Sequence, residues 1–201
     1  MPGMADPYRP LFLQAAGEIV AAAGLEGMTF AAVAARADLP VGSLRLRFDS
    51  EEQLADALAK RVFARCGTYV RERLVGADPS LHGLLTAYAH GLLRTFAAEG
   101  GLAPALLRGP GAFAADPGAD RLAEIRGHLV NAAARHAGEI VRPDARAALD
   151  TAARAMLRAC LEDAARPDSR GAGPGRSAYA RELADAALVH LRGPDRRLPA
   201  S

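Results

Sequence analysis

The sequence is poor in the residues that build β-sheets, disulfide frameworks and membrane spans. Its 201 residues include no tryptophan, and aromatic residues make up 5%. Cys66 and Cys160 lie too far apart for a CxxC metal site or a dense disulfide framework, so we expect two buried free thiols. No stretch of about 18 consecutive apolar residues occurs, which excludes a membrane-spanning helix. Asp6 and Pro7 precede the first hydrophobic stretch and argue against a secretory signal, so we expect a cytoplasmic protein without a membrane partner.

Motifs of the common catalytic and cofactor sites are missing as well. The sequence contains no GxSxG, no HExxH and no phosphate-binding glycine loop, so we expect a protein that is not an enzyme and holds no cofactor. His82 and His90 are eight residues apart, as are His128 and His136, but these pairs lack the i, i+4 spacing of helical metal ligands. Surface or hydrogen-bonded histidines are therefore favoured over a metal site.

What is present is an apolar pattern with helical spacing along most of the chain. Hydrophobic residues make up 50% of the sequence and charged residues 24%, and alanine, the best helix former, is the most frequent apolar residue. From about Arg9 to Ala23 apolar side chains recur every three or four residues, which predicts an amphipathic helix that ends at Gly24. No strand pattern of usable length occurs, so the predicted fold class is all-α. Further helices are expected over residues 29–37, 42–48, 51–74, 80–98, 120–136, 143–165 and 178–191.

The segment from Thr29 to Phe48, TFAAVAARADLPVGSLRLRF, has the spacing of a helix-turn-helix motif. Ala34 is small, as the close crossing of the two helices requires. Four residues later, Asp38 stands where the chain must bend through a left-handed conformation, which aspartate tolerates better than most residues. Leu39 is expected to fill the corner, and Leu44 to turn inward from the second helix. Five residues remain outward on that helix and would face the major groove of DNA: Val41, Gly42, Ser43, Arg45 and Arg47.

Residues from about Arg9 to Leu58 resemble the N-terminal domain of the tetracycline-repressor (TetR) family of bacterial transcription regulators. The shared pattern comprises Ala15-Ala16, Gly24, Thr29, Val33-Ala34, Gly42-Ser43-Leu44, Phe48, Ser50, Glu52 and Leu54. The resemblance implies a three-helix helix-turn-helix domain at residues 1–50 and a helical effector-binding and dimerisation domain at residues 51–201. It also implies a homodimeric repressor that binds double-stranded operator DNA and is released by a small-molecule effector. The DNA-contacting residues would be Thr29, Arg36, Val41, Gly42, Ser43, Arg45 and Arg47.

The resemblance extends to the second domain as a set of expected roles. In the family the last two long helices of each subunit form a four-helix dimer interface, which here corresponds to residues 143–165 and 178–191. Small residues and leucines on these helices are the interface candidates, although the same faces could pack inside one subunit: Ala155, Ala159, Leu188 and Leu191. The candidates for the effector pocket are side chains that could equally belong to an ordinary core: Tyr88, Leu92, Phe96, Phe113, Leu129 and Met156.

Three features of the N-terminal segment favour a second interpretation. Residues 1–63 contain six basic and eight acidic side chains, whereas DNA binding draws much of its affinity from neutralising phosphates. Val41 cannot donate a hydrogen bond, and the Glu51 carboxylate would repel phosphate. The alternative is a helical ligand-binding protein that keeps the TetR-like fold and has weak or lost DNA binding.

Overall fold

The computed structural model describes residues 6–99, 101–107, 120–166, 168–169 and 173–193. Every regular element in these ranges is helical, which confirms the predicted all-α fold class. In the same ranges no helix is both long and apolar enough to cross a membrane. The described elements are α1 (Arg9–Ala23), the 3-10 turn η1 (Leu25–Gly27), α2 (Phe30–Ala37), α3 (Val41–Arg45), α4 (Glu51–Val75), α5 (Leu81–Ala98), α6 (Leu102–Leu106), α7 (Ala123–Ala133), the 3-10 turn η2 (Ala134–Glu139), α8 (Ala145–Ala164) and α9 (Arg176–Arg192).

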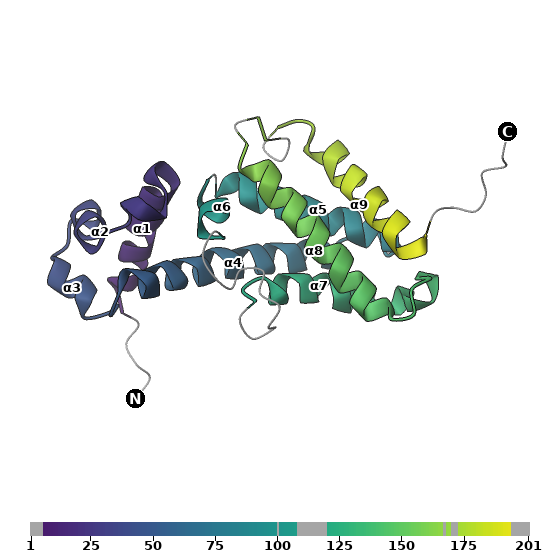
Figure 1. The fold of residues 1–201 in the computed structure, drawn as a ribbon, viewed down its shortest axis with the longest axis horizontal. Helices are drawn as coiled ribbons and strands as arrows, with labels where there is room; N and C mark the ends of the chain where they lie inside the picture. The colour runs from purple at the N-terminus through teal and green to yellow at the C-terminus, as the bar shows by residue number, and fades with distance from the viewer. Residues whose placement is uncertain (1–5, 100, 108–119, 167, 170–172, 194–201) are drawn as a thin grey trace.

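The long helix α4 joins two groups of helices (Figure 1). Helices α1 to α3 gather at its first turns, and the rest of α4 lies against α5 and α7. Helix α8 packs on α5 and α7, and α9 packs along α5 and α8. A methyl group added to Gly17 of α1 would touch Leu58 of α4, and one added to Gly91 of α5 would touch Val70 of α4. One helix, α4, therefore contributes packing contacts to both groups.

Helices α3 and α7 end or begin at other residues than their sequence patterns predict. The second helix of the helix-turn-helix ends at Arg45 rather than Phe48, although the Phe48 N–H still donates to the Leu44 carbonyl at 3.1 Å. The helix predicted over residues 120–136 begins at Ala123, and η2 follows it directly. The Oδ1 atom of Asp120 accepts a hydrogen bond from the Leu122 N–H at 2.9 Å, and the same buried carboxylate pairs with Arg126 of α7 at 2.6 Å. Asp120 therefore holds the turn before α7 and also pairs with the first part of the helix.

Candidate DNA-binding surface and effector site

The corner of the helix-turn-helix is held by local hydrogen bonds. The Thr29 hydroxyl accepts from the Ala32 N–H at 3.2 Å and caps α2. At the other end of α2, Asp38 lies in the left-handed region at φ 53° and ψ 45°. The next N–H, that of Leu39, donates back to the Ala34 carbonyl at 3.0 Å, which closes the end of the helix. The left-handed bend predicted at Asp38 is confirmed.

Helix α3 is anchored by one side chain and presents others to the outside. Leu44 is fully buried in the core of this domain. Gly42 and Arg45 are exposed, and Val41 and Ser43 are half-buried. No ion pair engages Arg45 within the described ranges. The guanidinium group of Arg45 is therefore free to approach a DNA duplex.

Leu46 is an exposed apolar residue on this surface that the sequence pattern did not single out. Its side chain is 86% exposed, in contrast to the fully buried Leu44 two positions earlier. Residues two apart on a helical turn face different directions, which is the signal that separates these leucines in the sequence. An apolar side chain beside Arg45 is suited to contact the methyl group of a thymine.

Arg47, predicted to contact DNA, is engaged within the protein by the N-terminal segment. Its Nε lies 2.5 Å from Oδ2 of Asp6, its Nη1 donates to the Ser43 carbonyl, and its guanidinium stacks 5.0 Å from the ring centre of Tyr8. The hydrogen bond from Arg47 holds the pKa of Asp6 below its ordinary value, so the carboxylate is charged at neutral pH. We call the contact between Asp6, Tyr8 and Arg47 the arginine clamp. Two of the three guanidinium nitrogens of Arg47, Nε and Nη1, are thus engaged inside the protein, so a phosphate would compete with Asp6 for this side chain.

Opening the clamp is expected to strengthen DNA binding. In an Asp6→Asn variant Arg47 loses its carboxylate partner and becomes available to a phosphate. We expect tighter binding to duplex DNA, and a dependence of log affinity on log salt that is steeper by about one unit. Fluorescence anisotropy of a labelled duplex at several salt concentrations measures both. Asp49→Asn removes an equal charge from the same domain without touching Arg47, and equal effects of the two variants would contradict the clamp.

Two other charged residues near the DNA-binding surface also have partners inside the protein. Nε of Arg36, a predicted DNA contact, lies 2.7 Å from Oε2 of Glu18, and both side chains are exposed. Glu51 accepts a hydrogen bond from the Phe30 N–H at 2.8 Å. The Glu51 carboxylate thus caps the start of α2 and ties it to the start of α4, which gives this acidic residue a structural role.

The predicted effector residues lie in the core of the second group of helices. Tyr88, Leu92 and Phe96 of α5 are fully buried, as is Leu129 of α7, and Met156 of α8 is buried with them. Phe113, also predicted to line the pocket, lies outside the described residues. The Tyr88 hydroxyl has no hydrogen-bond partner in the described structure, and burial raises its pKa well above the ordinary value. A buried hydroxyl without a partner is costly, so Tyr88 offers an unused polar group to a bound molecule.

A buried ionic cluster joins α7 to α8, and nothing in the sequence spacing predicted it. Arg126 contacts Asp120 at 2.6 Å through Nη1 and Asp150 at 2.8 Å through Nε. Arg154, one turn after Asp150, lies 3.4 Å from Asp120. Asp120 and Arg126 are buried, whereas Asp150 and Arg154 are partly exposed, so the two positive and two negative groups balance each other from the interior out to the surface. This cluster fixes the relative position of α7 and α8 around the predicted effector residues.

The predicted dimer residues lie at different depths on α8 and α9. Ala155 is exposed, Ala159 and Leu188 are half-buried, and Leu191 is fully buried inside the subunit. A groove of about 320 Å³ runs between the two helices, and Ala155, Ala159 and Met156 line its α8 side. The groove is mostly apolar because its other lining residues include Leu183 and several alanines.

Both cysteines are buried, and two of the histidines, His82 and His136, have carboxylate partners. Cys66 and Cys160 are buried free thiols, as predicted, and burial raises the pKa of Cys66 to about 12. His82 lies 3.1 Å from Asp185, and His136 lies 2.6 Å from Glu139. Within the described residues no group of three or more His, Cys, Asp or Glu side chains is arranged to hold a metal ion.

Known proteins match this chain in their structures but not in their sequences. No protein-family model and no curated protein matches the sequence. Among solved structures, the fatty acid degradation regulator FadR from Bacillus halodurans is 14% identical, with a TM-score of 0.69 over 96% of this chain and 98% of that chain. A TetR-family transcriptional regulator from Streptomyces coelicolor is 26% identical, with a TM-score of 0.61 over 91% of this chain and 98% of that one. FadR from Bacillus subtilis, solved in complex with stearoyl-CoA, is 14% identical, with a TM-score of 0.65 over 90% and 98% of the two chains.

These structures define the class to which the fold belongs. The matches extend over nearly the whole of both chains, and the matched proteins are helix-rich transcriptional regulators. The chain has the fold of the TetR family of transcriptional regulators, so the resemblance predicted from residues 9–58 is confirmed.

Proposed function

We propose that the protein is a DNA-binding transcriptional repressor that acts as a homodimer and is released from its operator by a small-molecule effector. The observation that carries this proposal is the geometry of α3, which is anchored by the buried Leu44 and presents Arg45 outward. An exposed guanidinium on a short helix after a tight corner is suited to the major groove, where arginine pairs with guanine edges.

Selection of genomic fragments by the purified protein tests the proposal. A regulator is expected to enrich a small number of fragments that share a palindromic sequence, because a two-fold symmetric dimer reads two equivalent half-sites. Enrichment of no fragment above an unrelated protein of the same charge would contradict it. The genes beside an enriched fragment would indicate the chemical class of the effector.

The groove between α8 and α9 supports the homodimer. Two recognition helices must reach successive major grooves about 34–36 Å apart, which requires a fixed contact between subunits. Small residues such as Ala155 allow helices of two subunits to approach closely, and the apolar groove beside it offers surface to bury. The subunit contact would thus be a four-helix arrangement of two α8–α9 pairs.

A charge placed in this groove is expected to separate the subunits. Ala155 is exposed, so an Ala155→Arg variant should fold normally while placing an unpaired charge in the proposed interface. We expect sedimentation velocity to show mainly monomers at concentrations where the unmodified protein is dimeric. Ala134→Arg in η2, at an exposed position outside the groove, should leave the dimer intact. If the Ala155→Arg protein is still dimeric, the subunit interface is not formed by α8 and α9.

Effector release would act through α4. A ligand that binds more tightly to a conformation in which the recognition helices are splayed shifts the population away from the DNA-binding state. The unpartnered Tyr88 hydroxyl marks a place in the core where a polar group of such a ligand would gain a hydrogen bond. Because α4 packs on α5 and also supplies core residues next to α1, a ligand at α5 would displace the DNA-binding helices through it.

A second candidate function is ligand binding without tight DNA binding. It is favoured by the ion pairs of Arg47 with Asp6 and of Arg36 with Glu18. Of the three arginines predicted to contact DNA, Arg45 alone has no ion pair in the described part of the chain. The two candidates differ in whether the protein binds duplex DNA at low salt.

A further inference from the structure

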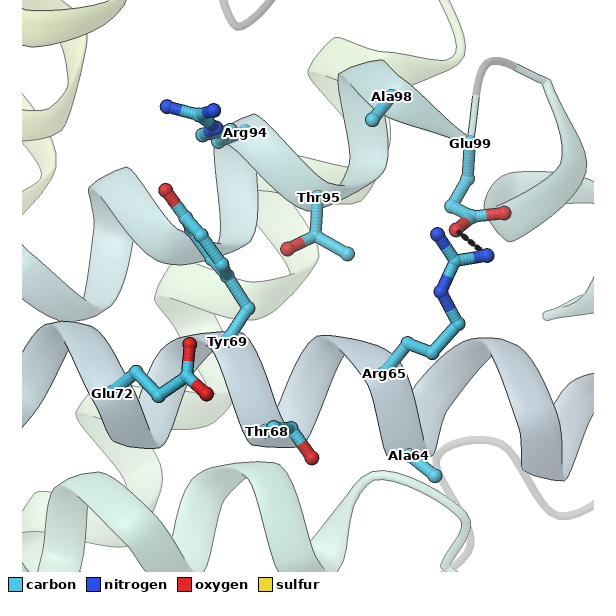
Figure 2. A pocket seen from close by; sticks show the side chains of 9 residues that line it. All are labelled: Ala64, Arg65, Thr68, Tyr69, Glu72, Arg94, Thr95, Ala98 and Glu99. Atoms are coloured by element: carbon cyan, nitrogen blue, oxygen red, sulfur yellow. Dashed lines mark ion pairs between the residues drawn. The ribbon is translucent and has the colours of Figure 1, made fainter.

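A cavity that Tyr88 does not line lies between α4 and α5, and Figure 2 shows the side chains around it. Its volume is about 470 Å³, within the range of about 300–1,000 Å³ typical of small-molecule sites. Four α4 residues that line it follow the i, i+3, i+4, i+7 pattern of one helix face: Arg65, Thr68, Tyr69 and Glu72. The α5 side is formed by Arg94, Thr95, Ala98 and Glu99. The lining therefore combines charged side chains with an aromatic ring and methyl groups.

Arg94 presents an unused hydrogen-bonding edge to this cavity. Its guanidinium carbon lies over the ring of Tyr69, 5.5 Å from the ring centre, in a cation–π contact. This contact uses none of the N–H donors of the guanidinium in a hydrogen bond, so these donors remain available. No carboxylate pairs with Arg94 among the residues described. The pKa of His90, which precedes Arg94 on α5, is lowered by its burial and then by the charges of Arg73, Arg176 and Arg94.

The carboxylate of Glu72 is also without an ion pair in the described structure, and it lies on the same side of the cavity as Tyr69 (Figure 2). The opposite end of the cavity is lined by an ion pair. There Arg65 and Glu99 pair with each other at 3.0 Å, so their charges are already satisfied. At one end of the cavity the charges of Arg65 and Glu99 are thus paired with each other. At the other end Arg94 and Glu72, which have no ion pair in the described structure, lie on either side of the Tyr69 ring.

We propose that this cavity binds a small zwitterion with an aromatic or apolar body, the chemistry of an α-amino acid. The carboxylate of the ligand pairs with the in-plane N–H groups of Arg94, a geometry in which arginine forms two parallel hydrogen bonds. The ammonium group pairs with Glu72. The body lies along Thr68 and the methyl group of Ala98, toward the Arg65–Glu99 pair. This site is separate from the effector site around Tyr88, and its occupancy does not require DNA binding.

Isothermal titration calorimetry of the full-length protein, without DNA, tests the site. The probes are L-phenylalanine, L-leucine, phenylacetate, which lacks the ammonium group, and 2-phenylethylamine, which lacks the carboxylate. We expect at least one amino acid to bind and each singly charged analogue to bind about tenfold more weakly or worse than L-phenylalanine, because each leaves one charged group of the site unpaired. Absence of heat with both amino acids, or equal affinity for phenylacetate and L-phenylalanine, would overturn the proposal.

Variants locate the site and separate it from the rest of the protein. Arg94→Gln and Glu72→Gln each remove one charge from exposed positions, and each should weaken amino acid binding about tenfold or more. Arg71→Gln and Glu124→Gln are matched controls on exposed positions outside the cavity and should bind as the unmodified protein does. Unchanged affinity in both Arg94→Gln and Glu72→Gln would place the ligand elsewhere. All of these measurements give the same answer whether or not the protein binds an operator.

Discussion

Replacing Arg45 by alanine is expected to weaken operator binding by about 1–3 kcal/mol, or about 5- to 150-fold in Kd. Arg45 is exposed on α3 and has no ion pair in the described ranges, so its guanidinium can meet a base edge or a phosphate without first losing a protein partner. Fluorescence anisotropy of a labelled operator duplex measures the change. Circular dichroism and sedimentation should show unaltered helix content and subunit association, because the side chain contributes nothing to the core.

Comparison of Arg45 with Arg47 adds a second expected result, because the two arginines differ in their contacts inside the protein. Sequence spacing places both arginines outward and predicts equal effects, but the structure shows Arg47 bound to Asp6 and stacked on Tyr8. We therefore expect Arg47→Ala to weaken binding less than Arg45→Ala. Arg45→Lys serves as the control for charge alone, and it should retain phosphate attraction while losing the two-pronged contact to guanine. If the Arg45→Ala protein binds DNA with unchanged affinity, α3 does not form the DNA interface.

Replacing Leu44 by alanine is expected to lower the free energy of unfolding by about 2–5 kcal/mol, the usual cost of emptying a leucine site in a packed core. Leu44 is fully buried and is the residue that fixes α3 against the rest of the domain. Urea unfolding followed by circular dichroism measures the loss. Because stability and the placement of α3 depend on the same side chain, the variant should also bind DNA more weakly.

Leu46 provides an internal control of the same residue type in the same turn. Its side chain is 86% exposed, so Leu46→Ala should change the free energy of unfolding by no more than about 0.5 kcal/mol. If Leu46 contacts a thymine methyl group, this variant should bind DNA more weakly while remaining as stable as the unmodified protein. Equal destabilisation by Leu44→Ala and Leu46→Ala would mean that α3 is seated differently from the structure described above.

The helix-turn-helix could be predicted from the sequence because its determinants are local. Ala34, Asp38 and Leu44 act within one turn and two short helices, and their roles depend on spacing and backbone preference. Thr29 caps α2 through a residue three positions away. The left-handed bend and the inward leucine therefore followed directly from residue types in sequence order.

The contacts that tune the site could not be predicted because they join distant parts of the chain. Asp6 meets Arg47 across 41 positions, and Glu51 meets the Phe30 N–H across 21. Their meeting depends on the path of the N-terminal segment and on how α1 packs against both α2 and α4. No periodicity in the sequence carries that information. The same holds for the contact of Asp120 with Arg154, which joins residues 34 positions apart, whereas the hydrogen bond from the Leu122 N–H to Asp120 is local.

The cavity between α4 and α5 illustrates a different limit. The apolar stripes of these helices predicted the buried faces correctly, and Tyr88, Leu92 and Phe96 follow that pattern. Tyr69 and Arg94 lie beside the buried stripe, where helical patterning predicts only solvated side chains. A concave surface arises from the way two helices diverge, and that divergence depends on close contacts such as the one between Gly91 and Val70.

The salt dependence of binding to random duplex DNA tests the central claim most directly. If α3 presents Arg45 to DNA, the protein should bind a random duplex measurably at low salt. Log affinity should then fall linearly with log salt, with a slope of about −0.9 for each phosphate contacted. A protein that shows no binding at the lowest salt concentration, while remaining folded, would contradict the account and favour a ligand-binding protein without a DNA target.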